Sequence, residues 1–156
     1  MKNSDFKIKF WGVRGSYPVA NKNYLKYGGN TSCIEINIGN HRIILDGGTG
    51  SIPLGDEIFQ EHISSADNVY DRTPMNITLL LSHIHQDHIQ GLNFFKPINV
   101  FTTHFSVFGY SGIESNLKIA LSALFLTSTI LKALGYPASA GDDICNIFPF
   151  FIILAA

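Results

Sequence analysis

An apolar segment that runs directly into a cluster of histidines is the feature that most constrains this chain. Residues 76–81 have the sequence NITLLL, which is typical of a strand buried on both faces. The chain then continues as SHIHQDH, which places His83, His85, Asp87 and His88 within one short segment. The sequence therefore predicts that these four side chains follow the end of a buried strand.

The cluster combines side chains that bind metal ions. Imidazole nitrogen and carboxylate oxygen are both zinc ligands, and a catalytic zinc site keeps one position open for water. Alternate residues of an extended chain point to the same side, so His83 and His85 can face one ion. Asp87 and His88 follow on the turn and can reach a second ion. The alternative is that the histidines are solvated and Asp87 caps the next helix, but four donors so close together favour metal binding.

Turn residues and apolar spacing predict the remaining elements. We expect strands at residues 6–11, 33–38, 41–45 and 97–104. The second and third strands form a hairpin, because Gly39 and Asn40 between them favour a tight turn. Helices are expected at residues 54–62 and 114–134, with a polar loop at residues 64–74.

Composition indicates one folded domain without a large charged surface. Of the 156 residues, 46% are hydrophobic and 15% are charged, which provides enough apolar surface for a core. The formal net charge is -1 and no run of Lys or Arg occurs. Stable binding to duplex nucleic acid is therefore disfavoured, whereas a nucleotide-sized substrate is not.

Cysteine usage and hydropathy indicate a cytoplasmic protein. Cys33 and Cys145 are the only cysteines and neither lies in a C-x-x-C motif, so no disulfide framework or thiolate zinc site is indicated. The first residues lack the continuous apolar segment of a secretory signal. Residues 119–131 form the longest apolar stretch near the C-terminus, and they are fewer than the roughly 20 that a membrane-spanning helix requires.

Four segments resemble the metallo-β-lactamase superfamily and occur in the order found there. They are FWGVRGS at residues 10–16, YGGNTS at 27–32, ILDGGTG at 44–50 and LLLSHIHQDHIQG at 79–91. The chain looks like the phosphodiesterase branch, which includes ribonuclease Z and the cyclic-phosphate phosphodiesterases. The resemblance covers residues 1–125, and residues 126–156 form an apolar tail without it.

The resemblance implies an α/β fold, the αββα sandwich, of which this chain carries the N-terminal half. It implies that His83 and His85 bind a first zinc or manganese ion. It implies that Asp87 and His88 bind the second, which makes Asp87 the candidate catalytic residue. Asp46 corresponds to an aspartate beneath the metal histidines, where a carboxylate would orient an imidazole. On sequence alone Asp46 could equally form a turn.

Several other polar residues have open roles. Arg14 lies in a Gly-flanked loop, where it could bind a substrate phosphate or pair with a nearby carboxylate. Thr31 and Ser32 could form a turn or line the pocket. Hydrogen-bonded or solvent-facing roles are expected for the histidines outside the cluster, which are His41, His62 and His104.

The chain departs from the superfamily after the cluster. Complete relatives supply another histidine, a metal-bridging aspartate and a final histidine, whereas the last histidine here is His104. The only later acidic residues after residue 125 are Asp142 and Asp143, in unrelated surroundings. These observations motivate the hypothesis that the chain is truncated or frameshifted, which the other reading frames of the coding DNA would test.

The expected activity is hydrolysis of a phosphodiester by a metal-activated hydroxide. The substrate would be a small phosphodiester or nucleotide, such as a cyclic nucleotide or an RNA 3′ extension. One alternative is a metallo-hydrolase of thioesters or lactams. Another is an inactive remnant that associates with a partner or forms a homo-oligomer, because half a sandwich leaves a sheet face uncovered.

Overall fold

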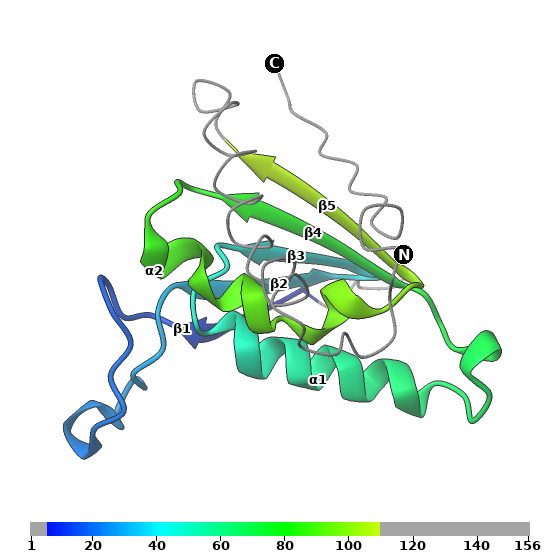
Figure 1. Cartoon of the computed structure of the whole chain (residues 1–156), viewed down its shortest axis with the longest axis horizontal. Coiled ribbons are helices and arrows are strands. Elements are labelled where there is room, and N and C mark those ends of the chain that lie inside the picture. Colours follow the sequence, from blue (N-terminus) through cyan, green and yellow to red (C-terminus); the bar gives the residue numbers. More distant parts are fainter. Residues whose placement is uncertain (1–5, 110–156) are drawn as a thin grey trace, which may run out of the picture.

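The computed structural model describes residues 6–109, which form a mixed five-stranded sheet with helices (Figure 1). The strands lie side by side in chain order. They are β1 (Phe6–Gly12), β2 (Cys33–Ile38), β3 (His41–Leu45), β4 (Met75–Leu81) and β5 (Thr103–Gly109). The first three are antiparallel, and β3, β4 and β5 are parallel. The predicted α/β class is therefore confirmed for this part of the chain.

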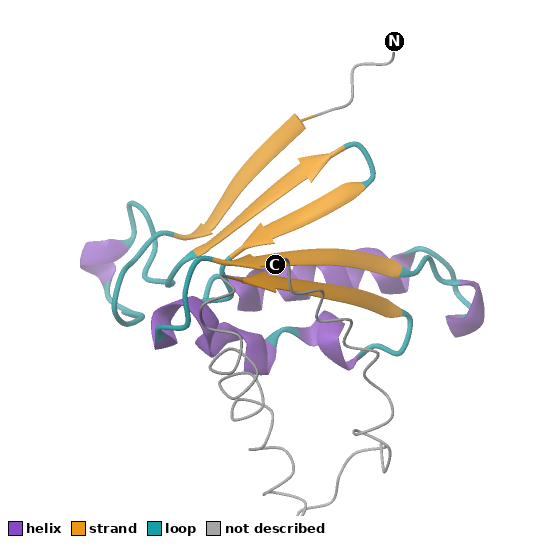
Figure 2. Cartoon of the chain, turned by 90° about the horizontal axis from the view of Figure 1, so that it is seen from above, coloured by secondary structure: helices purple, strands orange, loops and turns teal. Residues whose placement is uncertain are grey.

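Helices cover one face of the sheet (Figure 2). The longest is α1 (Ser51–Ser64), which connects β3 to β4. The connection from β4 to β5 contains α2 (Gln86–Ile89), η3 (Gln90–Phe94) and η4 (Lys96–Asn99). Two further 3-10 helices are η1 (Lys22–Tyr24) and η2 (Val69–Asp71). The helical connections from β3 to β4 and from β4 to β5 return the chain so that these three parallel strands end at the same edge of the sheet.

The hydrophobic core lies between the sheet and these helices. Leu54 and Ile58 of α1 are buried against strand residues such as Ile44 and Leu79, and Phe95 packs against Phe105. Burying apolar surface in this way is the main favourable contribution to folding. The core therefore holds the helices against one face of the sheet.

The opposite face of the sheet is apolar and accessible along β1 and β2, whereas Asn76 and Thr78 of β4 and His104 and Ser106 of β5 make it polar further across. In β1, Phe6, Ile8 and Phe10 are exposed, and they pair with Ile38, Ile36 and Ile34 of β2. Burial in β4 alternates along the strand, with Met75 and Ile77 buried and Leu80 exposed. The prediction that this strand is buried on both faces is wrong for the described residues, because the helices cover only one face.

Most predicted elements are present, with shifted ends. The hairpin of β2 and β3 has the predicted bounds, while α1 begins earlier because Ser51 donates backbone and side-chain hydrogen bonds to Gly48 O. The strand predicted at residues 97–104 is wrong. Pro97 instead stands in the first turn of η4, and its carbonyl accepts from Val100 N–H and the Thr103 hydroxyl, so β5 begins only at Thr103.

Some expectations lie outside the described residues. They are the helix at residues 114–134, the boundary at residue 125, the apolar tail, and the acidic pair Asp142 and Asp143. Within residues 6–109, no helix has the length and apolar character required to cross a membrane.

Candidate metal centre

The cluster follows β4, at the edge where the parallel strands β3 and β4 end. Asp46 directly follows β3, and Ser82 directly follows β4. β3 and β4 are paired in register up to Leu45 and Leu80, and beyond this point the backbone N–H of Ser82 donates to Oδ1 of Asp46. Ligand sites of parallel sheets lie at the carboxyl ends of the strands. The fold therefore places the cluster where such a site is expected.

Three imidazole rings of the cluster lie against one another. The ring centroids of His83 and His85 are 4.5 Å apart, and those of His83 and His88 are 4.0 Å apart. His83 and His85 precede α2, whereas His88 lies within it. The turn from strand to helix therefore brings side chains of both segments into one group.

Asp46 lies beneath this group and holds His88. Asp46 is buried, and its Oδ2 lies 2.8 Å from His88 Nδ1. It also accepts hydrogen bonds from the backbone N–H of Ser82 (2.9 Å), the Ser82 hydroxyl (2.9 Å) and the Ser32 hydroxyl (3.2 Å). A carboxylate without a proton only accepts hydrogen bonds, so this contact favours the tautomer in which His88 Nδ1 is the donor. This arrangement directs Nε2 of His88 away from Asp46 and orients the ring.

Asp46 reaches this position because its backbone adopts a left-handed conformation. Its φ angle is 61°, which side-chain-bearing residues rarely adopt but which Asp and Asn tolerate better than most. The strand β3 ends at this point, and the three glycines that follow belong to the loop before α1. Asp46 therefore has both of the roles that the sequence left open: it forms a turn, and it lies beneath the imidazoles.

Asp87 does not cap the helix after the cluster. The residue before α2 is His85, without a side-chain capping bond, and Asp87 lies inside the first turn. Oδ2 of Asp87 instead accepts a hydrogen bond of 2.8 Å from the backbone N–H of Ser16. This hydrogen bond lowers the pKa of the Asp87 carboxyl, and the nearby His88 and His83 lower it further against the opposing effect of desolvation. The capping alternative is therefore wrong, and Asp87 is held in its ionised form.

Glycines allow the cluster to pack closely on the loop that follows β3. A Cβ atom on Gly48 would lie 2.2 Å from the carbonyl oxygen of Asp87, and one on Gly91 would lie 2.0 Å from the carbonyl oxygen of Gly48. Gly47 donates a backbone hydrogen bond to His88 O. This role of Gly91 was not predicted, although a glycine three residues after His88 was a visible signal.

Thr31 and Ser82 connect the loops around the cluster. Thr31 is fully buried, and its hydroxyl accepts from the backbone N–H of Thr49 and from the Gln90 amide. The Ser82 hydroxyl donates to the Asp46 carboxylate, and its oxygen lies 2.9 Å from Nδ1 of His83. Thr31 therefore links loops rather than lining a pocket. Ser82 was not predicted, because a serine between a strand and a histidine carries no distinctive pattern.

Arg14 lies in a neighbouring loop and does not contact the cluster. Its Nε donates to the carbonyl oxygen of Tyr17 (2.8 Å), and its guanidinium lies 4.8 and 4.4 Å from the ring centroids of Tyr17 and Tyr24. Within residues 6–109 it forms no ion pair. The contact of this loop with the cluster is made by Ser16, two residues further along.

The histidines outside the cluster lie elsewhere. His62 is buried in α1, with Nδ1 2.9 Å from the carbonyl oxygen of Thr73. His41 and His104 are exposed, at or near the starts of β3 and β5, opposite the edge with the cluster. The structure therefore does not bring these three histidines to the candidate site.

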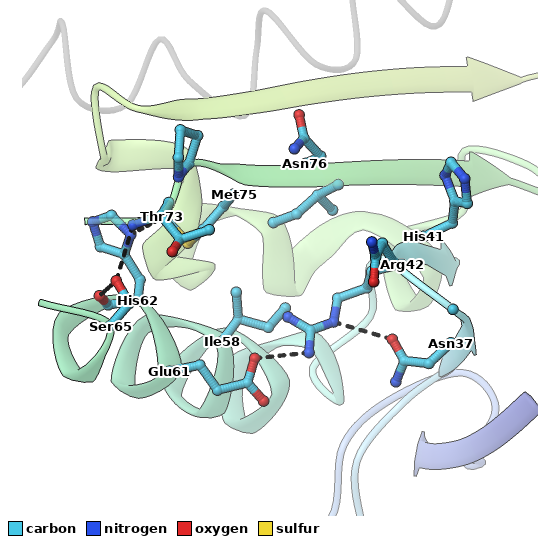
Figure 3. Close-up of a pocket in the computed structure, with 14 residues that line it drawn as sticks. Asn37, His41, Arg42, Ile58, Glu61, His62, Ser65, Thr73, Met75 and Asn76 are labelled. Atoms are coloured by element: carbon cyan, nitrogen blue, oxygen red, sulfur yellow. Dashed lines mark hydrogen bonds and ion pairs between the residues drawn. The ribbon is translucent and has the colours of Figure 1, made fainter. Parts of the chain in front are cut away.

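A separate cavity lies at the opposite end of the sheet (Figure 3). It lies between the β2–β3 turn, the end of α1 and the start of β4. Arg42 on its wall pairs with the buried Glu35 and with Glu61, each at 2.8 Å. The charge of this guanidinium is therefore already neutralised by protein carboxylates.

The donor types of the cluster fit a divalent metal ion, but its side chains do not form a complete ligand set. Nε2 of His88 and Oδ2 of Asp87 are 3.5 Å apart. Two ligands of a tetrahedral zinc ion are separated by about 3.3 Å at ordinary bond lengths, so this pair has suitable spacing. Among residues 6–109, however, no three His, Cys, Asp or Glu side chains converge in a way that could hold an ion.

Comparisons with known proteins yield one distant structural similarity. No protein-family model and no curated protein matches the chain. A crystal structure described as a "putative metallo-beta-lactamase" from Thermotoga maritima is similar over 83% of this chain, with 16% sequence identity and a TM-score of 0.37. The match spans 56% of that protein's length. Similarity of this degree does not assign the chain to a family.

Proposed function

We propose that the cluster binds zinc or manganese and that the chain belongs to a metal-dependent hydrolase of the metallo-β-lactamase superfamily, acting on phosphodiesters. The observation that carries this proposal is the grouping of His83, His85 and His88 above a buried carboxylate, Asp46. Histidine ligands of metal ions commonly donate their second ring N–H to a carboxylate. The four segments that resemble the superfamily support the proposal independently.

In this proposal each side chain has a defined task. Asp46 orients the ring of His88, and the Ser16 N–H keeps Asp87 ionised and positioned. His83, His85, Asp87 and His88 are the proposed ligands, with Asp87 as the proposed catalytic residue. A bound metal ion would lower the pKa of a water molecule and stabilise negative charge on the substrate.

The substrate assignment rests on the loop that carries Arg14. The segment FWGVRGS resembles the phosphodiesterase branch, and the structure ties this loop to Asp87 through Ser16 N–H. A guanidinium matches two phosphate oxygens, and Nη1 and Nη2 of Arg14 form no hydrogen bond within the described residues. A phosphodiester is therefore proposed over a thioester or lactam.

Metal analysis and a substrate comparison test the proposal. The purified chain should contain zinc or manganese by mass spectrometry and should hydrolyse bis-p-nitrophenyl phosphate faster than a thioester. The double variant His83→Ala/His85→Ala should lose both metal and activity. His41→Ala/His104→Ala removes two histidines outside the cluster and is the matched control, which should retain both. Absence of metal from the unmodified chain after incubation with either ion would refute the proposal.

An association role is a second candidate, favoured by the exposed apolar face of the sheet. An αββα sandwich would cover the face formed by Phe6, Ile8 and Phe10 with a second sheet, and sheets pack face to face through such surfaces. We propose that this face is covered by a partner protein or by a second copy of the chain. In that case the chain would act as part of an assembly.

A further inference from the structure

Residues 13–30 form a lobe that extends beyond the sheet beside the candidate metal centre (Figure 1). We call it the aromatic lobe. Its two arms are joined by backbone hydrogen bonds from Arg14 N–H to Asn30 O and from Val19 N–H to Gly29 O. Gly28 turns the chain with a φ angle of 80°, and its N–H donates to Tyr24 O. The aromatic lobe is therefore a defined substructure with a fixed base.

The aromatic lobe is connected directly to the cluster. The backbone N–H of Ser16 donates to Oδ2 of Asp87 at 2.8 Å. At its base, Thr31 accepts a hydrogen bond from Gln90, which follows α2. A ligand that lies along the aromatic lobe would thus reach the proposed reactive centre.

The aromatic lobe exposes three tyrosine rings. The exposed fractions are 60% for Tyr17, 40% for Tyr24 and 73% for Tyr27, and Leu25 beside them is also exposed. A shallow cavity on the lobe is lined by residues including Pro18, Lys22, Tyr24 and Leu25. Exposed rings grouped on one loop offer flat surfaces on which planar ligand groups can stack.

All charged side chains of the aromatic lobe are positive. The aromatic lobe contains Arg14, Lys22 and Lys26 and no Asp or Glu. Arg14 lies against the rings of Tyr17 and Tyr24, and Nζ of Lys26 lies 5.0 Å from the ring centroid of Tyr27. Within residues 6–109 none of the three cations forms an ion pair, so their charges remain available to an anionic ligand.

From this combination we infer that the aromatic lobe binds single-stranded nucleic acid, with bases stacked on the tyrosines and phosphates held by the three cations. Alternating aromatic and cationic side chains suit a strand whose bases are free to stack. Three rings and three cations suit several nucleotides rather than one. This inference rests on the proposed function only in naming its substrate class, because binding can be measured without hydrolysis.

Fluorescence anisotropy with a labelled oligouridine of roughly 12 nucleotides tests the inference on the full chain. Tyr27→Ala should weaken binding about tenfold, and Tyr27→Phe should restore most of the affinity because the ring is kept. Tyr70→Ala is the matched control, since Tyr70 is 84% exposed and lies in η2, outside the aromatic lobe. Lys22→Gln/Lys26→Gln should reduce the salt slope by about 1.4, from about 0.7 for each phosphate contact.

Other outcomes would overturn the inference. They are undetectable binding of the oligonucleotide at low salt, equal affinity for a duplex of the same length, equal loss in Tyr70→Ala, or full competition by an equal concentration of uridine monophosphate. Hydrolysis of bis-p-nitrophenyl phosphate is measured in parallel. Hydrolysis without oligonucleotide binding would refute the inference and leave the proposed function standing. Binding without hydrolysis would leave the inference standing and count against the proposed function.

Discussion

At the scale of single residues, Asp46 makes the most connections at the candidate site. Its carboxylate receives hydrogen bonds from Ser82, Ser32 and His88. Asp46→Asn keeps the shape and tolerates the left-handed backbone, but its amide presents N–H donors to groups that themselves donate. We expect a loss of about 1–3 kcal/mol in the free energy of unfolding and a loss of roughly tenfold to a hundredfold in metal affinity.

Urea unfolding and metal titration measure these two effects of Asp46→Asn. Asp67→Asn is a suitable control because Asp67 is exposed and outside the site. Equal stability and metal affinity in both variants would show that Asp46 does not orient His88 as described.

Cys33 provides a pH-dependent contribution to stability. The thiol is fully buried, and burial raises its pKa from 9.0 to about 12, with Glu35 and Asp46 adding to the rise. A raised pKa favours the protonated thiol in the folded state. The associated stability is therefore complete below pH 9 and is lost between pH 9 and about 12, where only the unfolded thiol ionises.

Comparison with Cys33→Ala isolates this contribution, because alanine cannot ionise. The difference in unfolding free energy between the two proteins should be constant up to pH 9 and should then fall by at most about 1.4 kcal/mol per pH unit. Urea unfolding at several pH values measures it. A difference that stays constant to pH 11 would contradict the raised pKa of the buried Cys33 thiol.

At the scale of elements, the turn after β4 depends on close contact with the loop after β3. A Cβ atom on Gly91 would collide with the carbonyl oxygen of Gly48 and with Ser51 Oγ. Gly91→Ala should therefore cost about 1–3 kcal/mol in the free energy of unfolding and displace the cluster. Gly15→Ala is the control because nothing lies within 4 Å of its added Cβ, and equal unfolding curves for the two variants would contradict the packing described.

Local sequence signals predicted the elements that local interactions determine. The hairpin around Gly39 and Asn40 has the predicted bounds, because its turn and the alternation of its strands both lie within a short segment. The strand predicted at residues 97–104 failed, because its apolar residues belong to η4 and pack on α1 rather than extend in the sheet. Tertiary packing decided that case, and a short apolar run does not reveal it.

The candidate site was predicted in kind but not in detail. Residue types identified His83, His85, Asp87 and His88, since donors so close together are unusual. The hydrogen bond from the Ser16 N–H to the Asp87 carboxylate joins residues far apart in the sequence, and no local sequence pattern indicates it. Their function as metal ligands stays a prediction.

At the scale of the whole molecule, the accessible sheet face predicts self-association. Phe6, Ile8 and Phe10 are 61%, 49% and 64% exposed, and the register of β1 with β2 makes them continuous with Ile34, Ile36 and Ile38. Contiguous exposed apolar surface of this kind marks an interaction site. The described residues also place β1 at the edge of the sheet, so this face continues to a strand edge.

Sedimentation velocity over a range of protein concentrations tests this prediction. The unmodified chain should sediment increasingly as a dimer or larger species, and Ile8→Lys/Phe10→Lys should shift it toward the monomer because two charges would have to be desolvated at the interface. Phe101→Lys is the matched control, since Phe101 is 63% exposed but lies in the turn before β5. A monomeric unmodified chain at all concentrations would contradict self-association, and an equal shift in Phe101→Lys would assign it to another surface.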